Sequence, residues 1–115
     1  MLRKVWLALG IAWLLAVWVL SLIPVPPLAQ EVNDKIEHAT TYALLMLWWG
    51  QLGFPPMRVG LALIAMGIGI EFAQGLTPYR SFDVHDMLAN TLGVSVASLL
   101  LLSPLGRVLQ MLEKK

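Results

Sequence analysis

The chain has 115 residues, of which 58% are hydrophobic and 13% are charged. Soluble domains are nearer to half apolar and a quarter charged, and a domain this small cannot hide such an excess of apolar surface in its core. The composition therefore indicates a membrane protein. A formal net charge of +1 excludes a strongly basic nucleic-acid binder, and the lack of cysteine excludes disulfides and thiolate metal sites.

Four apolar segments follow one another along the chain, each about as long as a helix that crosses the hydrocarbon core of a bilayer. We predict membrane-spanning helices at about residues 5–23, 36–54, 57–76 and 87–103. Proline, which ends helices, stands in the connections after the first three segments. The sequence therefore predicts an all-α membrane protein, a four-transmembrane-helix bundle that forms a single domain over residues 1–115.

The first apolar segment follows Arg3 and Lys4, as the core of a signal peptide would. Its uncharged run is longer than the roughly 7–15 residues of a usual signal-peptide core, and no clear small-residue cleavage pair follows it. We therefore expect this segment to remain in the protein as a helix.

The segment after the fourth span, residues 105–115, is amphipathic. Leu105, Val108, Leu109 and Leu112 stand at helical spacing, with Arg107, Lys114 and Lys115 around them. A basic amphipathic helix of this kind lies along an anionic membrane surface. We therefore predict a short C-terminal interfacial helix.

The basic residues are unequally divided between the two sides that these spans define. Six of the eight lie on the side of the two termini and the Pro55-Pro56 turn, namely Arg3, Lys4, Arg58, Arg107, Lys114 and Lys115. Because cytoplasmic loops carry the excess of lysine and arginine, both termini are expected in the cytoplasm. Six of the seven acidic residues lie on or near the opposite side, namely Glu31, Asp34, Glu37, Glu71, Asp83 and Asp86.

Polar residues of the last three spans are expected at one depth, because residues equally distant from a turn lie level in an antiparallel pair. Counting outward from the turns near residues 55 and 80 places six side chains in a layer one or two helical turns inside the outer boundary. They are His38, Tyr42, Glu71, Gln74, Asp86 and Asn90. Spacings of three and four also place them on one face of each helix, and Asp34 continues the stripe of His38.

Small residues extend the polar stripes toward the other side of the membrane. Gly60 and Gly67 follow the Glu71 stripe, and Gly93 and Ala97 follow the Asn90 stripe. Small residues let helices approach closely in lipid. These four are therefore predicted helix-packing positions, and the polar side chains are expected to point into the bundle.

Glu71 is the most costly of the polar residues, since an ionised carboxylate inside a bilayer costs at least about 2.5–3.5 kcal/mol. It must be protonated, paired or hydrated. The available partners are Arg80, Lys35 and His38, and we expect a contact of Glu71 with Arg80 or His38.

The ordered set of motifs resembles the VanZ-like family, over about half of the chain. It runs Asp34-Lys35-x-x-His38-x-x-x-Tyr42, then Glu71-x-x-Gln74, then Arg80-Ser81-x-x-x-x-Asp86-x-x-x-Asn90-x-x-Gly93. The family is named for a member linked to low-level teicoplanin resistance, and most members are small bacterial membrane proteins. The resemblance implies a multi-pass protein of the bacterial cytoplasmic membrane that handles a lipid-linked or lipophilic ligand of the cell envelope, and it supplies no reaction.

Three functional hypotheses follow for the polar layer. In the first, it binds the head group of an envelope lipid or lipid-linked precursor, with Lys35 and Arg80 taking an anionic group. In the second, the protein is a membrane-embedded enzyme in which His38 is the acid or base, oriented by Asp34 or Glu71, while Arg80 stabilises an anion. In the third, the layer only locks the bundle. Ser81 is a further candidate residue of the polar site and could be a nucleophile, but nothing marks it as activated.

The sequence predicts no cofactor and no metal. A metal set drawn from His38, Glu71, Asp83, His85 and Asp86 is conceivable, but its spacing matches no zinc signature. No glycine-rich phosphate loop is present. Transport by alternating access is not favoured, because four helices are few and no inverted repeat is evident.

Overall fold

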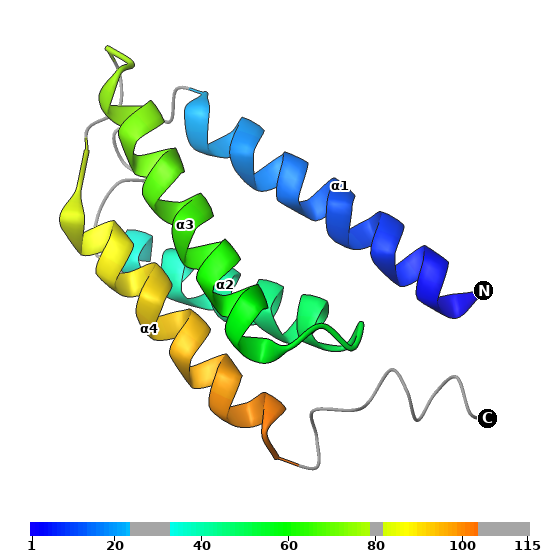
Figure 1. Ribbon diagram of the computed structural model, residues 1–115. Coiled ribbons are helices and arrows are strands. Elements are labelled where there is room, and N and C mark those ends of the chain that lie inside the picture. The colour runs from blue at the N-terminus through cyan, green and yellow to red at the C-terminus, as the bar shows by residue number, and fades with distance from the viewer. Residues whose placement is uncertain (24–32, 79–81, 104–115) are drawn as a thin grey trace.

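The computed structural model describes residues 1–23, 33–78 and 82–103, and in these ranges every regular element is an α-helix (Figure 1). The helices are α1 (Leu2–Leu22), α2 (Asn33–Gly50), α3 (Pro56–Gly75) and α4 (Val84–Leu101). The predicted all-α class is therefore confirmed. The predicted C-terminal interfacial helix, residues 105–115, lies outside the described residues.

Three of the four helices, α1, α3 and α4, are long and apolar enough to cross a membrane. The prediction of four such spans is therefore wrong by this measure, because α2 does not qualify. Its first turn contains Asp34, Lys35 and Glu37, which lower the mean hydropathy of an 18-residue helix that has no length to spare.

Local sequence explains where the helices begin and end. Pro56 occupies the first turn of α3, where a missing N–H costs nothing. Asp83 caps α4, and its carboxylate accepts a hydrogen bond from the backbone N–H of His85 at 2.9 Å. Helix α2 stops at Gly50, earlier than predicted, because the chain turns there and Gly53 adopts a φ of 89° that only glycine adopts easily.

The closest pair of helices is α2 and α4, with α3 packed against both. Gly93 of α4 lies so close to the backbone of Ala39 in α2 that a Cβ atom at this position would collide with the Ala39 carbonyl. The buried core continues from this contact, away from the polar residues. It contains Tyr42, Leu45, Met46, Val59, Leu63, Val94 and Ala97.

Helix α1 lies on the outside of this group, alongside α3 (Figure 1), and Gly10 is its only buried residue. Near its N-terminal end, the Trp6 and Trp48 rings stack with centroids 3.8 Å apart. Each indole N–H also donates to the backbone carbonyl of the other residue, at 2.8 and 2.9 Å. Near its C-terminal end, the Ser21 carbonyl accepts from Gln74 at 2.8 Å. Both ends of α1 are thus tied to the bundle.

Large apolar side chains point outward from all four helices. They include Leu15, Val19, Ile36, Leu61, Phe72, Leu88, Leu92 and Leu99, each more than half exposed. Exposed apolar surface on this scale is unfavourable in water and suited to lipid. The fold therefore agrees with the membrane assignment from composition.

Candidate functional site

Four of the five buried polar side chains of the described residues, those of Glu71, Gln74, Asp86 and Asn90, gather at one end of the bundle, whereas Gln51 follows α2 at the other end. Together with the half-buried His38, the four come from the N-terminal parts of α2 and α4 and from the C-terminal part of α3. Glu71 stands four residues before the end of α3, which at about 1.5 Å per residue is about 6 Å inside that end. We call His38, Glu71, Asp86 and Asn90, with Lys35 and Asp83 at their edge, the polar cluster.

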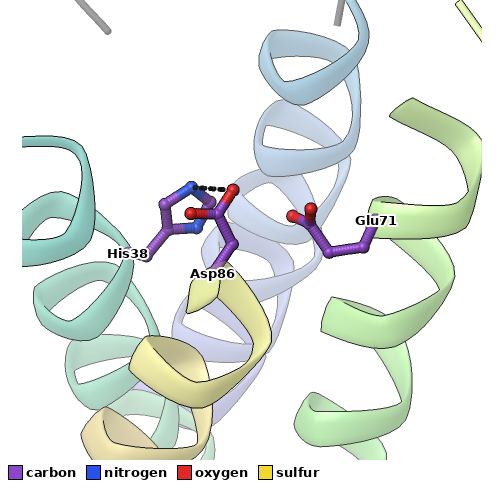
Figure 2. A group of neighbouring side chains, drawn as sticks. All are labelled: His38, Glu71 and Asp86. Carbon is purple, nitrogen blue, oxygen red and sulfur yellow. Dashed lines mark ion pairs between the residues drawn. The ribbon is translucent and has the colours of Figure 1, made fainter. Parts of the chain in front are cut away.

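His38 uses both ring nitrogens within this cluster. Nδ1 lies 3.1 Å from Asn90 Oδ1, a hydrogen-bond distance. Nε2 lies 3.5 Å from Asp86 Oδ2, as the dashed line in Figure 2 marks. The histidine ring therefore stands between α2 and two positions on α4, one helical turn apart.

Glu71 is completely buried. Its Oε1 accepts a hydrogen bond from the backbone N–H of Asp83 at 3.0 Å. Its Oε2 is buried and has no hydrogen-bond partner among the residues that the structure describes. Figure 2 shows the Glu71 carboxylate pointing from α3 toward Asp86 and His38. Glu71 therefore lies near His38, as expected, but its hydrogen bond comes from the Asp83 backbone.

Lys35 forms ion pairs with two aspartates of the α4 end. Its Nζ lies 2.7 Å from Asp83 Oδ2 and also contacts Asp86 Oδ1. The hydrogen bond from Lys35 lowers the pKa of the Asp83 carboxyl below its ordinary value. The side chains of Lys35 and Asp83 are 39% and 34% exposed, against 9% for Asp86, so these two residues form the outer edge of the polar cluster.

Tyr42 and Gln74, also predicted in this layer, are buried next to the polar cluster. A Cβ atom at Gly67 would lie 2.9 Å from Asn90 Nδ2 and 3.4 Å from the Tyr42 hydroxyl, so this glycine lets both side chains approach α3. Gln74 donates to the Ser21 carbonyl, as described above, and so connects α3 to α1.

The predicted packing positions all lie at helix contacts. Gly93 meets the Ala39 backbone, a Cβ at Gly60 would lie 3.3 Å from Val94, and Ala97 is fully buried in the core. These contacts hold α2, α3 and α4 close enough for short polar side chains to reach one another.

Three predicted site residues are not part of the described geometry. Arg80 and Ser81 lie outside the described residues, and so does the side chain of Asp34, although its backbone belongs to α2. His85 lies on the surface, with its side chain 81% exposed and Nδ1 3.2 Å from Asp83. It stands apart from the buried cluster.

Asp83 is the important residue missing from the predicted polar site, although it belongs to the conceivable metal set drawn from the sequence. It supplies the N–H for Glu71, an oxygen for Lys35 and the cap of α4. A signal was present, since an aspartate directly before an apolar helical run is a favoured N-cap. The polar neighbours that it contacts come from α2 and α3, so only the fold reveals its second role.

The chemistry available in the polar cluster is that of carboxylates and an imidazole. One ligand atom each from His38, Glu71 and Asp86 lies within 4.8 Å of the others, a group that could hold a metal ion. The pair of His38 and Asp86 is also suited to general acid–base chemistry. The ammonium group of Lys35, which we expected to bind an anionic group, is held by two aspartates in the structure.

A cavity of about 330 Å³ lies in the other half of the bundle, away from the polar cluster. Its walls are mainly apolar and include Leu14, Trp49 and Leu63, and Arg58 is the one charged residue among the described residues that line it. The cavity therefore does not enclose the polar cluster.

Comparison with known proteins identifies the family. Residues 34–109 match the family described as VanZ/LLP1, which covers more than half of the chain. A fission yeast protein (Schizosaccharomyces pombe), described as "Uncharacterized protein C11E3.10", is 35% identical over 81 residues. The match covers 65% of this chain and 50% of the yeast protein, so the chain spans about half the length of that relative.

No solved structure matches the chain. A relative in yeast means that the resemblance alone does not indicate a bacterial source. The family match includes the polar residues of α2, α3 and α4 and leaves out α1. The predicted resemblance is confirmed, and the chain belongs to the VanZ/LLP1 family.

Proposed function

We propose that this VanZ/LLP1 protein binds the polar head group of an envelope amphiphile, a lipid or a lipid-linked precursor, at the end of the bundle that holds the polar cluster. The observation that carries the proposal is the complete burial of Glu71 beside His38 and Asp86. Ionisable side chains inside a membrane protein are costly and are functional candidates by default. A purely structural layer would be served by neutral amides such as Gln74 and Asn90.

The proposal includes four membrane crossings, with both termini in the cytoplasm of a bacterial cell. Helix α2 crosses with its charged first turn at the outer surface, where Lys35 and Glu37 reach the head-group region. Support comes from Arg3, whose guanidinium donates to the Leu52 carbonyl at 2.5 Å. This contact brings the basic N-terminus to the turn before Arg58, so Arg3 and Arg58 share the end opposite the polar cluster.

Access to the polar cluster is through its edge. Lys35 and Asp83 are each about one third exposed, while Glu71 and Asp86 lie beneath them. A head group would therefore contact the Lys35–Asp83 pair first, with its acyl chains against the exposed apolar faces of the helices. Arg80 supplies the fork for an anionic group, since Lys35 is engaged by aspartates. In a teicoplanin-exposed cell, occupation of this site would reduce binding of the acylated antibiotic at the membrane surface.

Native mass spectrometry of the protein from mild detergent tests the binding. We expect a retained lipid or precursor in the unchanged protein and its loss in the Arg80→Ala variant. Arg58→Ala is the matched control, because it also removes one arginine charge, from an exposed position at the end of the bundle opposite the polar cluster. Equal retention in both variants, or no retained amphiphile in the unchanged protein, would contradict the proposal.

A second candidate function is catalysis on an envelope substrate, favoured by the position of His38 Nε2 at 3.5 Å from Asp86. In this hypothesis His38 transfers a proton and Asp86, in place of the expected Asp34 or Glu71, orients the ring. Lipid profiles of cells producing the unchanged protein or the His38→Gln variant test it. A product that disappears with His38→Gln and persists with His85→Gln supports catalysis, whereas identical profiles exclude it.

A further inference from the structure

Three electron-donating atoms surround one point in the polar cluster. They belong to His38, Glu71 and Asp86, they come from three different helices, and all lie within 4.8 Å of one another (Figure 2). Glu71 is fully buried, and its Oε2 has no hydrogen-bond partner among the described residues. An unpartnered carboxylate oxygen aimed at a second carboxylate is unfavourable unless a shared proton or a cation lies between them.

The tautomer of His38 also favours a positive charge at this point, because it directs a nitrogen lone pair toward a carboxylate. With the side chain of Asn90 as placed, Oδ1 can only accept, so Nδ1 of His38 donates the proton of this 3.1 Å hydrogen bond. In the neutral imidazole the lone pair then lies on Nε2, which faces Asp86 Oδ2 at 3.5 Å. Metal-binding histidines have this arrangement, in which the second ring nitrogen donates to a neighbouring acceptor and fixes the ring.

The two carboxylates are anchored in the same way, each through one oxygen. The backbone N–H of Asp83 holds Glu71 Oε1, and Lys35 holds Asp86 Oδ1. Each carboxylate therefore keeps its other oxygen for the central point. Outer-shell hydrogen bonds of this kind orient ligands before a metal arrives.

From this geometry we propose that His38, Glu71 and Asp86 bind one divalent metal ion of the zinc and manganese class. One imidazole nitrogen and two carboxylate oxygens are ligands that such ions accept. In a tetrahedral zinc site with bonds of about 2.0–2.2 Å, ligand atoms stand about 3.4 Å apart. The three ligand atoms, which lie within 4.8 Å of one another, would move closer together to reach that spacing.

Three protein ligands leave a coordination position open, as in catalytic zinc sites. A phosphate or carboxylate oxygen of a head group would fill it. This last step depends on the proposed function, whereas binding of the metal does not. The metal would also give an otherwise acidic cluster its affinity for an anion.

Metal binding is measured on the full chain, purified in mild detergent with a tag free of histidine and stripped with a chelator. Zn²⁺ or Mn²⁺ is then added, and bound metal is quantified by mass spectrometry and by titration calorimetry. We expect one ion per chain. We expect at least about 100-fold weaker binding in Glu71→Gln and Asp86→Asn, and about 10–100-fold weaker binding in Asn90→Ala, which removes an outer-shell partner.

His85→Gln is the matched control, because this exposed histidine is one residue from Asp86 and outside the group of three. It should keep the affinity of the unchanged protein. Folding is monitored by the thermal unfolding midpoint without metal. Glu71→Gln preserves shape, so we expect its metal-free midpoint to be kept or raised while the rise on adding Zn²⁺ is lost.

Absence of binding to the unchanged protein would overturn the proposal and would leave protons as the positive charge of the cluster. The proposal would also be overturned if Glu71→Gln and Asp86→Asn bound the metal as tightly as the unchanged protein does, or if His85→Gln lost binding. Metal binding without a retained amphiphile would support this inference and contradict the proposed function. A retained amphiphile without metal binding would contradict this inference and support the proposed function.

Discussion

At the scale of single residues, the polar cluster depends on how charges are neutralised inside an apolar bundle. Within the polar cluster, the three carboxylates of Glu71, Asp83 and Asp86 lie close to one lysine, Lys35, and one histidine, His38. Lys35 neutralises the two aspartates directly. Glu71 receives only a backbone N–H among the described residues, and therefore stays the most demanding group.

The Lys35→Met variant should lower the free energy of unfolding by about 1–2 kcal/mol, because Asp86 keeps its buried position and loses its cationic partner. The effect is smaller than the about 3–5 kcal/mol of a fully buried pair, since Lys35 is 39% exposed and solvent screens the charges. Denaturation in mixed micelles measures it. Glu37→Gln, an exposed charge on the same helix, is the control and should change stability little. An equal loss in both variants would contradict the paired geometry.

At the scale of helices, the position of the polar cluster follows from close packing between α2 and α4. Gly93 allows the α4 backbone to approach the carbonyl of Ala39, one residue from His38. Gly67 plays a similar part for α3, where Asn90 and Tyr42 approach the glycine. The small residues in α3 and α4 therefore set the distances over which His38, Glu71 and Asp86 meet.

The Gly93→Ala variant should be destabilised by about 1–3 kcal/mol, because the new methyl group would overlap backbone that cannot rotate away. It should also separate α2 from α4 and weaken any ligand binding at the polar cluster. The same substitution at Gly69 is the control, since its Cβ would lie at an ordinary 3.5 Å from the Trp18 ring. Thermal unfolding in detergent compares the two. Similar unfolding midpoints would show that α2 and α4 lie farther apart.

At the scale of the whole molecule, the described part of the chain has its charged side chains at the two ends and apolar side chains between them. One end carries the polar cluster, and the other carries Arg3 and Arg58 near the Trp6–Trp48 stack. This division suits a protein that crosses a bilayer with a fixed orientation.

Labelling of single cysteines tests that orientation, because the chain has no native cysteine. Glu37→Cys places an exposed thiol near the start of α2, at the polar-cluster end of the bundle. Met57→Cys places one near the start of α3, at the other end. If α2 crosses the membrane, an impermeant maleimide added to intact cells should label position 37 and not position 57. Labelling of both, or of neither before lysis, would show that the two positions share a side and that α2 does not span.

The amino-acid sequence by itself determined the helical class, the approximate helix bounds and the family. These depend on local properties, such as the length of apolar runs and the prolines between them, and on an ordered set of motifs. The spacings within each helix, His38 to Tyr42, Glu71 to Gln74 and Asp86 to Asn90, also indicated which polar residues share a helix face, because a helix repeats every three to four residues.

Only the tertiary structure decided which atoms meet. It placed Asp86 beside His38, engaged Lys35 with two aspartates, and directed the Asp83 backbone to Glu71. Such pairings depend on the rotation and separation of the helices to within about 1 Å, and these follow from packing at positions such as Gly93 and Ala39. No spacing within one helix contains that information, since the three candidate metal ligands come from three helices.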